Sequence, residues 1–358
     1  MTIKRFTAQG FRCLAHVEFE PDPQYTLVYG ANASGKTSLL EALAYLGRGK
    51  SFRGAAPSNL IQHGKPELVL FGQVEAGGRL ANVGVRNSRA GLEVRIDGDS
   101  SGGAAALAAA LPLQVIDPDV HDLVCGGPDV RRRFLDWLTF HVEPEYLALW
   151  RQFRRALKQR NAALKSGGPR ESVQAWDREF CGLGERVGTA REAALAGALQ
   201  SLKEHGTALL GAEIDFRYSA GWSADQSLEA ALEGHFERDR ALGTTQVGPH
   251  RADLRLIYDE RQARRLVSRG QQKLLASSMI LAATETAQRV LGRPLVLLLD
   301  DPAAELDRKS LARLIERVAG LGSQVIATSL QEDELVFPVS PRVFHVEQGA
   351  IRETTTGA

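Results

Sequence analysis

One octapeptide constrains the fold of this chain more than any other segment. It fits the pattern G-x-x-x-x-G-K-[ST] at every fixed position and consists of Gly30, Ala31, Asn32, Ala33, Ser34, Gly35, Lys36 and Thr37. An apolar, β-branched segment at 25–29 precedes it, and a helix-forming segment at 38–45 follows it. A glycine loop between a strand and a helix turns backbone N–H groups towards phosphates, and the helix N-terminus adds partial positive charge. The segment therefore predicts a nucleoside-triphosphate site in an α/β fold.

Two side chains of this loop have the chemistry that a triphosphate requires. The Lys36 ammonium can reach the β- and γ-phosphates, which makes it a candidate catalytic residue, and the Thr37 hydroxyl can ligate Mg²⁺. The alternative is a chance glycine turn before a helix, and the strand and helix signals on its two sides disfavour that interpretation.

A strand that ends in two carboxylates is the second strong signal. Residues 295–299 are Leu-Val-Leu-Leu-Leu, a run typical of a central parallel strand, and two aspartates follow directly. Such a strand places an acidic group beside Mg²⁺ at the carboxyl edge of the sheet. We expect Asp300 to hold the metal and Asp301 to orient or deprotonate the attacking water. The alternatives are a turn or cap residue for Asp300 and a field-shaping carboxylate for Asp301.

Composition and charge exclude several classes of protein. Of the 358 residues 44% are hydrophobic and 24% are charged, and 44 Lys and Arg stand against 43 Asp and Glu, so any basic surface for nucleic acid must be local. The apolar stretches are too short to span a bilayer, and the N-terminus lacks the apolar core of a signal peptide. Cys13, Cys125 and Cys181 are scattered, which indicates neither a disulfide framework nor a zinc site. We therefore expect a cytoplasmic protein.

The pattern of apolar residues divides the chain into three parts. Residues 1–118 alternate like strands around the P-loop helix, and residues 119–240 have mainly helical periodicity. Residues 241–358, which contain the acidic strand, would complete the first part. The predicted fold class is an α/β P-loop ATPase head interrupted by a helical insertion.

The insertion has the pattern of an antiparallel helical hairpin. Apolar stripes at 146–164 and 176–202 are joined by the glycine-containing segment 165–169. Three glycines weaken the prediction that the second helix is unbroken, namely Gly182, Gly184 and Gly188.

Two further runs complete an ordered pattern. Residues 268–273 are Ser-Arg-Gly-Gln-Gln-Lys at a helix start, where a serine N-cap would suffice to explain the first residue, and residues 304–307 are Ala-Glu-Leu-Asp. The P-loop, the Ser-x-Gly-Gln run, the two carboxylates and the Glu-Leu-Asp run, in that order, resemble the ABC-type ATPases. The resemblance is to the branch that contains the SMC and Rad50 proteins. It narrows to a bacterial family of recombinational-repair ATPases through segments 30–41, 51–53, 126–136, 248–253 and 268–273.

The resemblance implies a dimer that ATP assembles. ATP with Mg²⁺ would bind at the P-loop, and Asp300 would complete the metal site. Ser268, Gly270 and Gln271 would contact the triphosphate of a second copy, and Asp307 would lie with Ser268 at the dimer interface. ATP would join two copies by charge-assisted hydrogen bonds that hydrolysis removes. The family further implies sequence-independent binding of single- and double-stranded DNA, the mediators RecO and RecR, indirect action on a RecA-type recombinase, and no membrane.

The chain departs from the wider ABC pattern at two positions. Ser329 stands where transporters carry a switch histidine, and Asp301 stands where a glutamate is usual. A histidine hydrogen bond to the γ-phosphate is therefore missing, and the aspartate reaches less far. Both differences predict slow hydrolysis that acts as a clock or a switch.

A local basic face supports DNA binding. Segment 147–165 contains no acidic residue, and four of its basic residues share one helix face: Arg151, Arg154, Arg155 and Lys158. Such a face can contact phosphates, although a solvated basic surface is an equal alternative. The three arginines at 131–133 point in different directions on a helix, and we expect some of them to pair with carboxylates in the core.

Three rival functions share parts of this pattern. A small-molecule kinase shares the P-loop but needs neither the run at 268–273 nor the run at 304–307. A transporter ATPase subunit would carry the switch histidine and a coupling surface for membrane helices. A true SMC or Rad50 protein needs hundreds of residues of heptads, and here only a short helical segment separates the two halves of the head.

Overall fold

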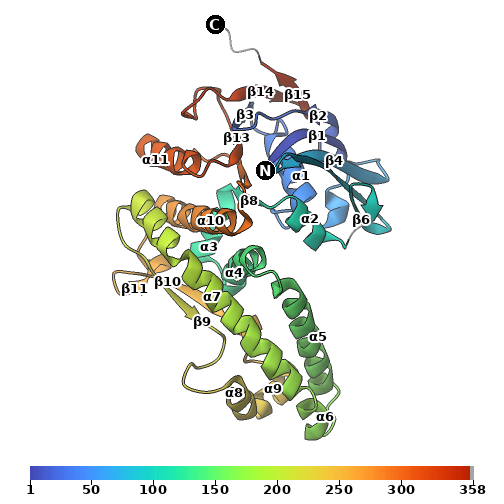
Figure 1. The fold of residues 1–358 in the computed structure, drawn as a ribbon, viewed down its shortest axis with the longest axis vertical. Coiled ribbons are helices and arrows are strands. Elements are labelled where there is room, and N and C mark those ends of the chain that lie inside the picture. Colours follow the sequence, from blue (N-terminus) through green and yellow to red (C-terminus); the bar gives the residue numbers. More distant parts are fainter. Residues whose placement is uncertain (101, 355–358) are drawn as a thin grey trace. The chain divides into compact units, whose positions relative to one another are not determined.

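The computed structural model describes residues 1–100 and 102–354, which form two compact units (Figure 1). Unit 1 consists of residues 1–120 and the chain from Ser277 onward, and unit 2 consists of residues 121–276. Residues 241–276, which we expected in the ATPase head, cluster in unit 2. The reason is that strand β10 (Asp253–Tyr258) pairs antiparallel with β9 (Asp215–Ser219).

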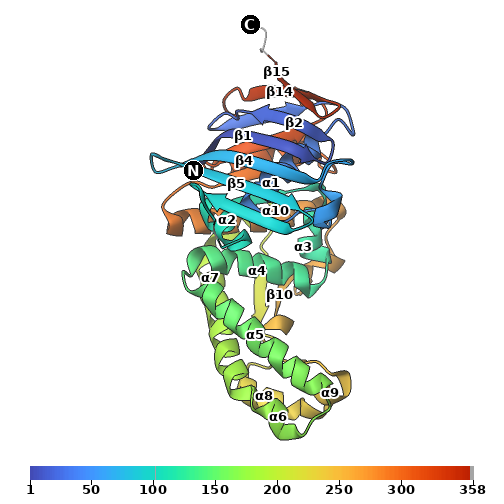
Figure 2. The same cartoon turned by 90° about the vertical axis from the view of Figure 1, so that its right-hand side faces the viewer.

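Unit 1 contains an antiparallel sheet in the order β2-β1-β4-β5-β6-β7, whose long strands lie side by side in Figure 2. Apolar and polar residues alternate along its strands, so one face of the sheet is buried. The strand-like alternation noted for residues 1–118 is confirmed in six strands of this sheet. Their bounds are β1 Thr2–Phe11, β2 Leu14–Phe19, β4 Glu67–Ala76, β5 Arg79–Ser88, β6 Gly91–Ile96 and β7 Asp99–Ser100.

The second sheet of unit 1 is mainly parallel and has the order β15-β14-β3-β13-β12-β8. Its central strands are buried along their whole length, as their continuous apolar sequences predict. Strand β15 alone runs antiparallel to its neighbour β14. The bounds are β3 Tyr25–Tyr29, β8 Leu113–Ile116, β12 Val296–Leu299, β13 Gln324–Ser329, β14 Arg342–Glu347 and β15 Ala350–Glu353.

Helix α1 (Lys36–Arg48) forms the centre of unit 1. It contacts β1, β4 and β5 of the antiparallel sheet and β8, β12 and β13 of the parallel sheet. Leu39, Leu43 and Leu46 are fully buried in the core that these elements share. The other helices with residues in this unit are η1 (Pro57–Asn59), α2 (Ala104–Ala110), η2 (Pro118–His121), α11 (Arg308–Ala319) and the end of α10 (Arg269–Leu291).

Unit 2 is built on a helical hairpin and a three-stranded sheet. Helices α5 (Tyr146–Lys165) and α7 (Asp177–Leu210) pack against each other and are joined through α6 (Arg170–Gln174), which confirms the predicted hairpin (Figure 2). The sheet has the order β11-β10-β9, with β11 at Arg261–Gln262. The remaining elements are α3 (Asp122–Cys125), α4 (Pro128–Val142), α8 (Leu228–Gly234), α9 (Phe236–Leu242), η3 (Pro249–Arg251) and η4 (Ala263–Arg265).

Helix α7 is unbroken despite its glycines, and two of them have a packing reason. A Cβ atom at Gly184 would lie 2.6 Å from Cδ2 of the buried Leu228, and one at Gly188 would lie 3.1 Å from the Trp222 ring. Glycine at these positions lets neighbouring elements approach the helix backbone. Within the described residues, no helix is long and apolar enough to cross a membrane.

Candidate nucleotide-binding site

The predicted phosphate loop of unit 1 connects β3 to α1 in a conformation that its glycines permit. Gly30 has φ 155° and Gly35 has φ 118°, both in the region that side chains rarely adopt. A Cβ atom at Gly30 would lie 2.4 Å from the Val346 carbonyl oxygen. Ala33 also has a positive φ, 61°, which is uncommon outside glycine. The backbone of the loop therefore turns at positions where glycine is favoured, with Ala33 as the one exception.

Lys36 lies buried beneath this loop. Its ammonium donates hydrogen bonds to the carbonyl oxygens of Gly30 at 2.6 Å and Ala31 at 2.9 Å. Burial lowers the pKa of Lys36, and the carboxylates of Asp301 and Asp300 oppose that shift. The ammonium is thus ready to exchange two carbonyl partners for a phosphate.

Asp300 accepts hydrogen bonds from two threonines at the carboxyl edge of the parallel sheet. Oδ1 of Asp300 lies 3.1 Å from the Thr37 hydroxyl and 2.8 Å from the Thr328 hydroxyl. Burial raises the pKa of Asp300, and the two hydroxyl donors oppose the shift. Because β12 and β13 are parallel neighbours, their ends bring Asp300 and Thr328 together. The structure thus brings the two predicted metal ligands, Thr37 and Asp300, into contact.

Asp301 has a left-handed backbone conformation, with φ 46°. Its backbone N–H donates to the Thr328 hydroxyl at 2.9 Å, and its carboxylate contributes the strongest attraction to the Lys36 ammonium. A non-glycine residue at positive φ carries a backbone cost that functional sites often retain. Asp301 therefore stabilises the charged form of the P-loop lysine from the end of the acidic strand.

Ser329, at the position of the switch histidine, makes a local bond. It is fully buried, and its hydroxyl donates to the Gln331 carbonyl oxygen at 2.6 Å. That bond engages the hydroxyl proton within the turn that follows β13.

Sequence reasoning missed two residues at this edge, Thr328 and Asp117. Asp117 directly follows β8, a parallel neighbour of β12, so both strands end at the same edge. Burial raises the pKa of Asp117 to about 6, and the carboxylates of Asp119 and Asp300 add to the shift. A carboxylate directly after a predicted buried strand was the available signal for Asp117.

The segment beside the P-loop also contains a polar network that sequence reasoning missed. The guanidinium of Arg12 forms an ion pair with Glu41, a fully buried residue of α1. The Ser51 hydroxyl donates to the same carboxylate. Arg12 has φ 50°, so its backbone is held in an uncommon conformation at the end of β1. Glu41 thereby joins the end of β1, helix α1 and the segment that follows α1.

The signature run begins helix α10, as predicted. The Ser268 hydroxyl accepts from the Gln271 N–H at 3.4 Å, and the Gln271 side chain accepts from the Ser268 N–H at 2.8 Å. This reciprocal pair is a capping box, so local structure alone accounts for both residues. Ser268 is exposed and Gly270 half-buried, and both belong to unit 2. Their contact with a second copy stays a prediction.

Asp307 has a structural role within unit 1. Its carboxylate accepts from the Ser310 N–H and hydroxyl, both at 2.9 Å, and so caps helix α11. These hydrogen bonds lower the pKa of Asp307. Glu305, two residues earlier, has φ 68°. The role of Asp307 at a dimer interface stays a prediction.

The predicted basic face lies on α5 and is exposed. Among the described residues no acidic partner lies within ion-pair distance of its four members, Arg151, Arg154, Arg155 and Lys158. By contrast, Arg160 of the same helix is fully buried and bonds Asp177 and Asp239. The helix thus separates its cations into an exposed face and a buried structural group.

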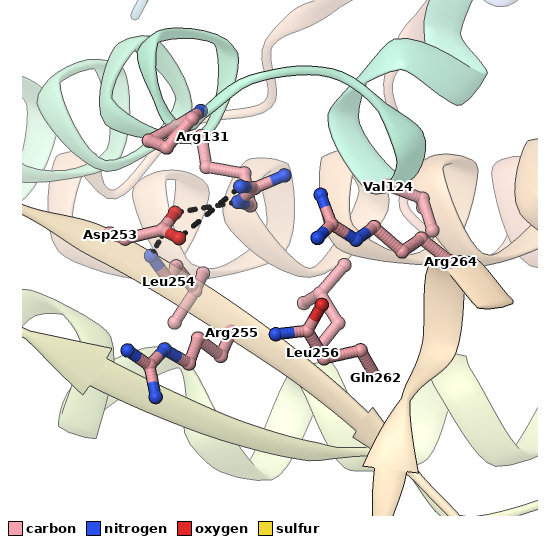
Figure 3. Close-up of a pocket in the computed structure, with 9 residues that line it drawn as sticks. Val124, Arg131, Asp253, Leu254, Arg255, Leu256, Gln262 and Arg264 are labelled. Atoms are coloured by element: carbon pink, nitrogen blue, oxygen red, sulfur yellow. Dashed lines mark hydrogen bonds and ion pairs between the residues drawn. The ribbon is translucent and has the colours of Figure 1, made fainter.

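The two family segments at 126–136 and 248–253 meet in unit 2. Arg131 forms a bidentate ion pair with Asp253, which confirms the expected pairing of an arginine from 131–133 (Figure 3). Arg132 donates to the Ala252 carbonyl oxygen at 2.8 Å. Arg191 of α7 bonds Asp136 and the Pro249 carbonyl oxygen. Neither segment belongs to the nucleotide site of unit 1.

One group outside the nucleotide site has metal-binding atoms. His121, Asp122 and Cys125 place their ligand atoms within 4.8 Å of one another at the start of unit 2. The spacing of the cysteines did not predict this group, because its other two members are a histidine and an aspartate. Burial raises the pKa of Cys125, so its thiol is protonated at neutral pH.

Known proteins match the chain along nearly all of its length. The profile of the family described as RecF/RecN/SMC N terminal domain matches residues 2–351. The chain is 37% identical over 357 residues to the DNA replication and repair protein RecF of Shewanella pealeana, which covers 98% of this chain and 99% of that protein. It is 39% identical over 367 residues to RecF of Pseudomonas syringae pv. syringae, which covers 99% of each.

Two solved structures have the same fold. One is the recombination mediator protein RecF with ATP in the RecFOR pathway, at TM-score 0.89 and 23% identity, covering 99% of this chain and 97% of that one. The other is an Smc head bound to the C-winged helix domain of ScpA, at TM-score 0.60 and 14% identity. The match covers 99% of this chain and 97% of that one. The similarity confirms the predicted fold class, an ABC-type ATPase head with a helical insertion.

Proposed function

Because the chain belongs to the RecF/RecN/SMC family, and within it to the RecF proteins, we propose that it is an ATP-dependent DNA-binding protein of recombinational repair and replication. In this proposal ATP binds in unit 1 and drives two copies together on DNA at gaps, and slow hydrolysis releases them. The observation that carries the proposal is the hydrogen bond between Thr37 and Asp300, since it joins the P-loop to the acidic strand.

The residues of this site fit ATP with Mg²⁺. The Ser34 hydroxyl is buried in the loop with no hydrogen-bond partner, so it can bond a phosphate oxygen. Thr37 and Asp300 would hold Mg²⁺, which would neutralise charge on the β- and γ-phosphates. A buried carboxylate with a raised pKa gains from a cation beside it.

The side chains divide the work of hydrolysis. Lys36 leaves its two carbonyl partners and pairs with the phosphates. Thr328 orients Asp300 through its hydroxyl. Asp301 orients a water molecule and accepts its proton while the water oxygen attacks the γ-phosphorus and the bond to the ADP oxygen breaks. The bonded Ser329 hydroxyl and the short Asp301 side chain support a slow rate.

Dimerisation would use residues outside this site. The exposed Ser268, with Gly270 and Gln271, would contact the γ-phosphate bound by the second copy, and Asp307 would lie at the same interface. The exposed basic face of α5 would contact the DNA backbone without reading bases. Loading of a RecA-type recombinase with RecO and RecR follows from the family.

One experiment tests the mechanism. Self-association by analytical ultracentrifugation and duplex binding by fluorescence anisotropy would be measured with ATP, with ADP and without nucleotide. We expect a dimer that binds DNA with ATP only, and loss of both properties in Lys36→Met and Ser268→Arg. Ser223→Arg, an exposed serine of unit 2, is the matched control and should behave as wild type. DNA binding that is indifferent to nucleotide and to both substitutions would refute the ATP clamp.

A second measurement separates this function from a small-molecule kinase. An ATPase rate that DNA stimulates, with phosphate as the product and no phosphorylated metabolite, supports the clamp. A phosphorylated small molecule in place of free phosphate would support the kinase.

A further inference from the structure

A pocket of unit 2 lies between the two family segments, 126–136 and 248–253, and helix α5. It has a volume of about 280 Å³ and is lined by residues of α4, α5, α7 and η3. Four of its lining residues are arginines: Arg132, Arg133, Arg154 and Arg191. The nucleotide chemistry of unit 1 uses none of them, so the pocket needs its own explanation.

Two carboxylates line the same pocket, but both already have partners. Asp136 accepts from Arg191 and from the Tyr146 hydroxyl, which ties it into the buried core. Asp129 pairs with Arg133 at 3.3 Å, one helical turn along α4. The other two lining arginines, Arg132 and Arg154, form no ion pair among the described residues.

Arg132 is the more constrained of the two. It is half-buried and donates one hydrogen bond, to the Ala252 carbonyl oxygen. Burial lowers the pKa of Arg132; the carboxylates of Asp129 and Asp253 oppose this shift, and the guanidinium groups of Arg191 and Arg251 add to it. A bound anion would offset the cost of desolvating this cation. A guanidinium retains several free N–H donors in a fork that matches phosphate oxygens.

Arg154, the other arginine without an ion pair, joins the pocket to the basic face. Arg154 lines the pocket and is also one of the four exposed cations of α5. The lining histidine, His250, is neutral because burial lowers its pKa to about 4, so it adds no charge. We propose that the pocket between Arg132, Arg133 and Arg154 binds a phosphate of the DNA backbone while the α5 face follows the adjacent phosphates. The proposal rests on the proposed function, since it assigns the DNA site of the ATP-bound dimer.

The arrangement of the positive charges favours DNA over an acidic peptide as the ligand. The cations on α5 recur at intervals of three and four residues over two helical turns, which presents a row of positive charge along the helix. A regularly charged backbone matches a row of cations, and the pocket at its side accommodates one phosphate more deeply than the others. Such binding would not depend on the base sequence of the DNA, because only backbone phosphates would be contacted.

Salt dependence of DNA binding measures these contacts directly. Duplex binding by the full chain with ATP would be titrated over a range of salt concentrations for wild type, Arg154→Ala, Arg132→Lys and Arg186→Ala. We expect Arg154→Ala to reduce the slope of log K against log salt by about one, as one lost phosphate contact requires. Arg132→Lys should weaken binding because a lysine cannot form a bidentate contact. Arg186, exposed on α7 and outside the pocket, is the control and should leave the slope unchanged.

A gain of affinity is the sharper test. Asp129→Asn removes a carboxylate from the pocket and releases Arg133, so DNA should bind more tightly and with a steeper salt slope. A purely structural role of Asp129 would not produce tighter binding. Asp225→Asn, which changes an exposed aspartate of unit 2, is the matched control and should bind as wild type.

The outcomes distinguish the pocket from the proposed function. If Arg154→Ala and Asp129→Asn bind DNA as wild type while ATP still controls binding, the pocket assignment fails and the ATP clamp stands. If wild type shows no ATP-dependent binding, the proposed function itself fails. If Arg154→Ala instead weakens binding of an oligoglutamate peptide and leaves DNA binding intact, the pocket is a site for an acidic protein segment and the assignment is overturned.

Discussion

The hydroxyl of Thr328 donates a 2.8 Å hydrogen bond to Oδ1 of Asp300 and accepts one from the backbone N–H that follows Asp300. Thr328 is fully buried at the end of β13, so water cannot replace either bond. One hydroxyl group thus holds the carboxylate of Asp300 and the backbone of Asp301 at the end of the acidic strand. Thr37 reaches the same oxygen from the P-loop side.

Removing this hydroxyl should impair hydrolysis. We expect Thr328→Val to reduce the steady-state ATPase rate and to lower the free energy of unfolding by about 1–3 kcal/mol, because two buried polar groups lose a partner. Thr328→Ser should retain most of the activity. Ser329→Ala, which loses a bond to the Gln331 carbonyl oxygen instead, should hydrolyse ATP at close to the wild-type rate. An unimpaired Thr328→Val enzyme would show that Asp300 needs no such support.

Alanine substitutions at two glycines of α7 should change the free energy of unfolding in opposite directions. Gly182 is exposed, and a Cβ atom there meets nothing within 4 Å, so Gly182→Ala should raise the free energy of unfolding by about 0.5–1 kcal/mol. Gly184→Ala should lower it by about 1 kcal/mol, because Leu228 is fully buried and cannot move away freely. Urea denaturation of both variants checks the signs, and equal effects would contradict the packing argument.

The buried ion pair of Arg160 should be costly to break. Arg160 and Asp239 are both fully buried, so Arg160→Met should lower the free energy of unfolding by about 3–5 kcal/mol by leaving a buried charge unpaired. The double variant Arg160→Met with Asp239→Leu should recover much of that loss. Arg170→Ala, which breaks an exposed pair with Glu233, serves as the control and should leave the unfolding midpoint nearly unchanged. Failure of the double variant to recover stability would show that the ion pair of Arg160 with Asp177, which this variant also lacks, carries the stabilisation.

His250 should make stability depend on pH between about 6.5 and 4. Burial lowers its pKa from 6.5 to about 4, so over this range the unfolded chain binds a proton that the folded chain does not. Stability then falls as the pH falls, by up to about 3 kcal/mol, and is unaffected above this range. His250→Gln removes the titrating group, so its loss of stability between pH 7 and pH 5 should be smaller than that of wild type. Parallel curves from urea denaturation at each pH would contradict the assignment.

Much of the fold could be predicted because its signals are local. The alternation in 67–75 and the apolar run in 295–299 each reflect burial on one or two faces of a strand, and both strands formed where expected. The P-loop pattern is local as well, since its glycines act on the backbone of the same eight residues. The boundary expected near residue 240 differed from the structure because the pairing of β10 with β9 is a contact between distant segments.

The sequence by itself determined the α/β head, the helical hairpin and the position of the candidate phosphate loop, because each depends on spacing within one segment. Only the tertiary structure decided which charged side chains are free to act. Arg154 and Arg160 lie on one helix, yet one is exposed and the other is enclosed by Asp177 and Asp239. Thr328 lies beside Asp300 because their strands, β13 and β12, are parallel neighbours and end at the same edge of the sheet. Burial and strand order arise from contacts between distant residues, and no single segment encodes them.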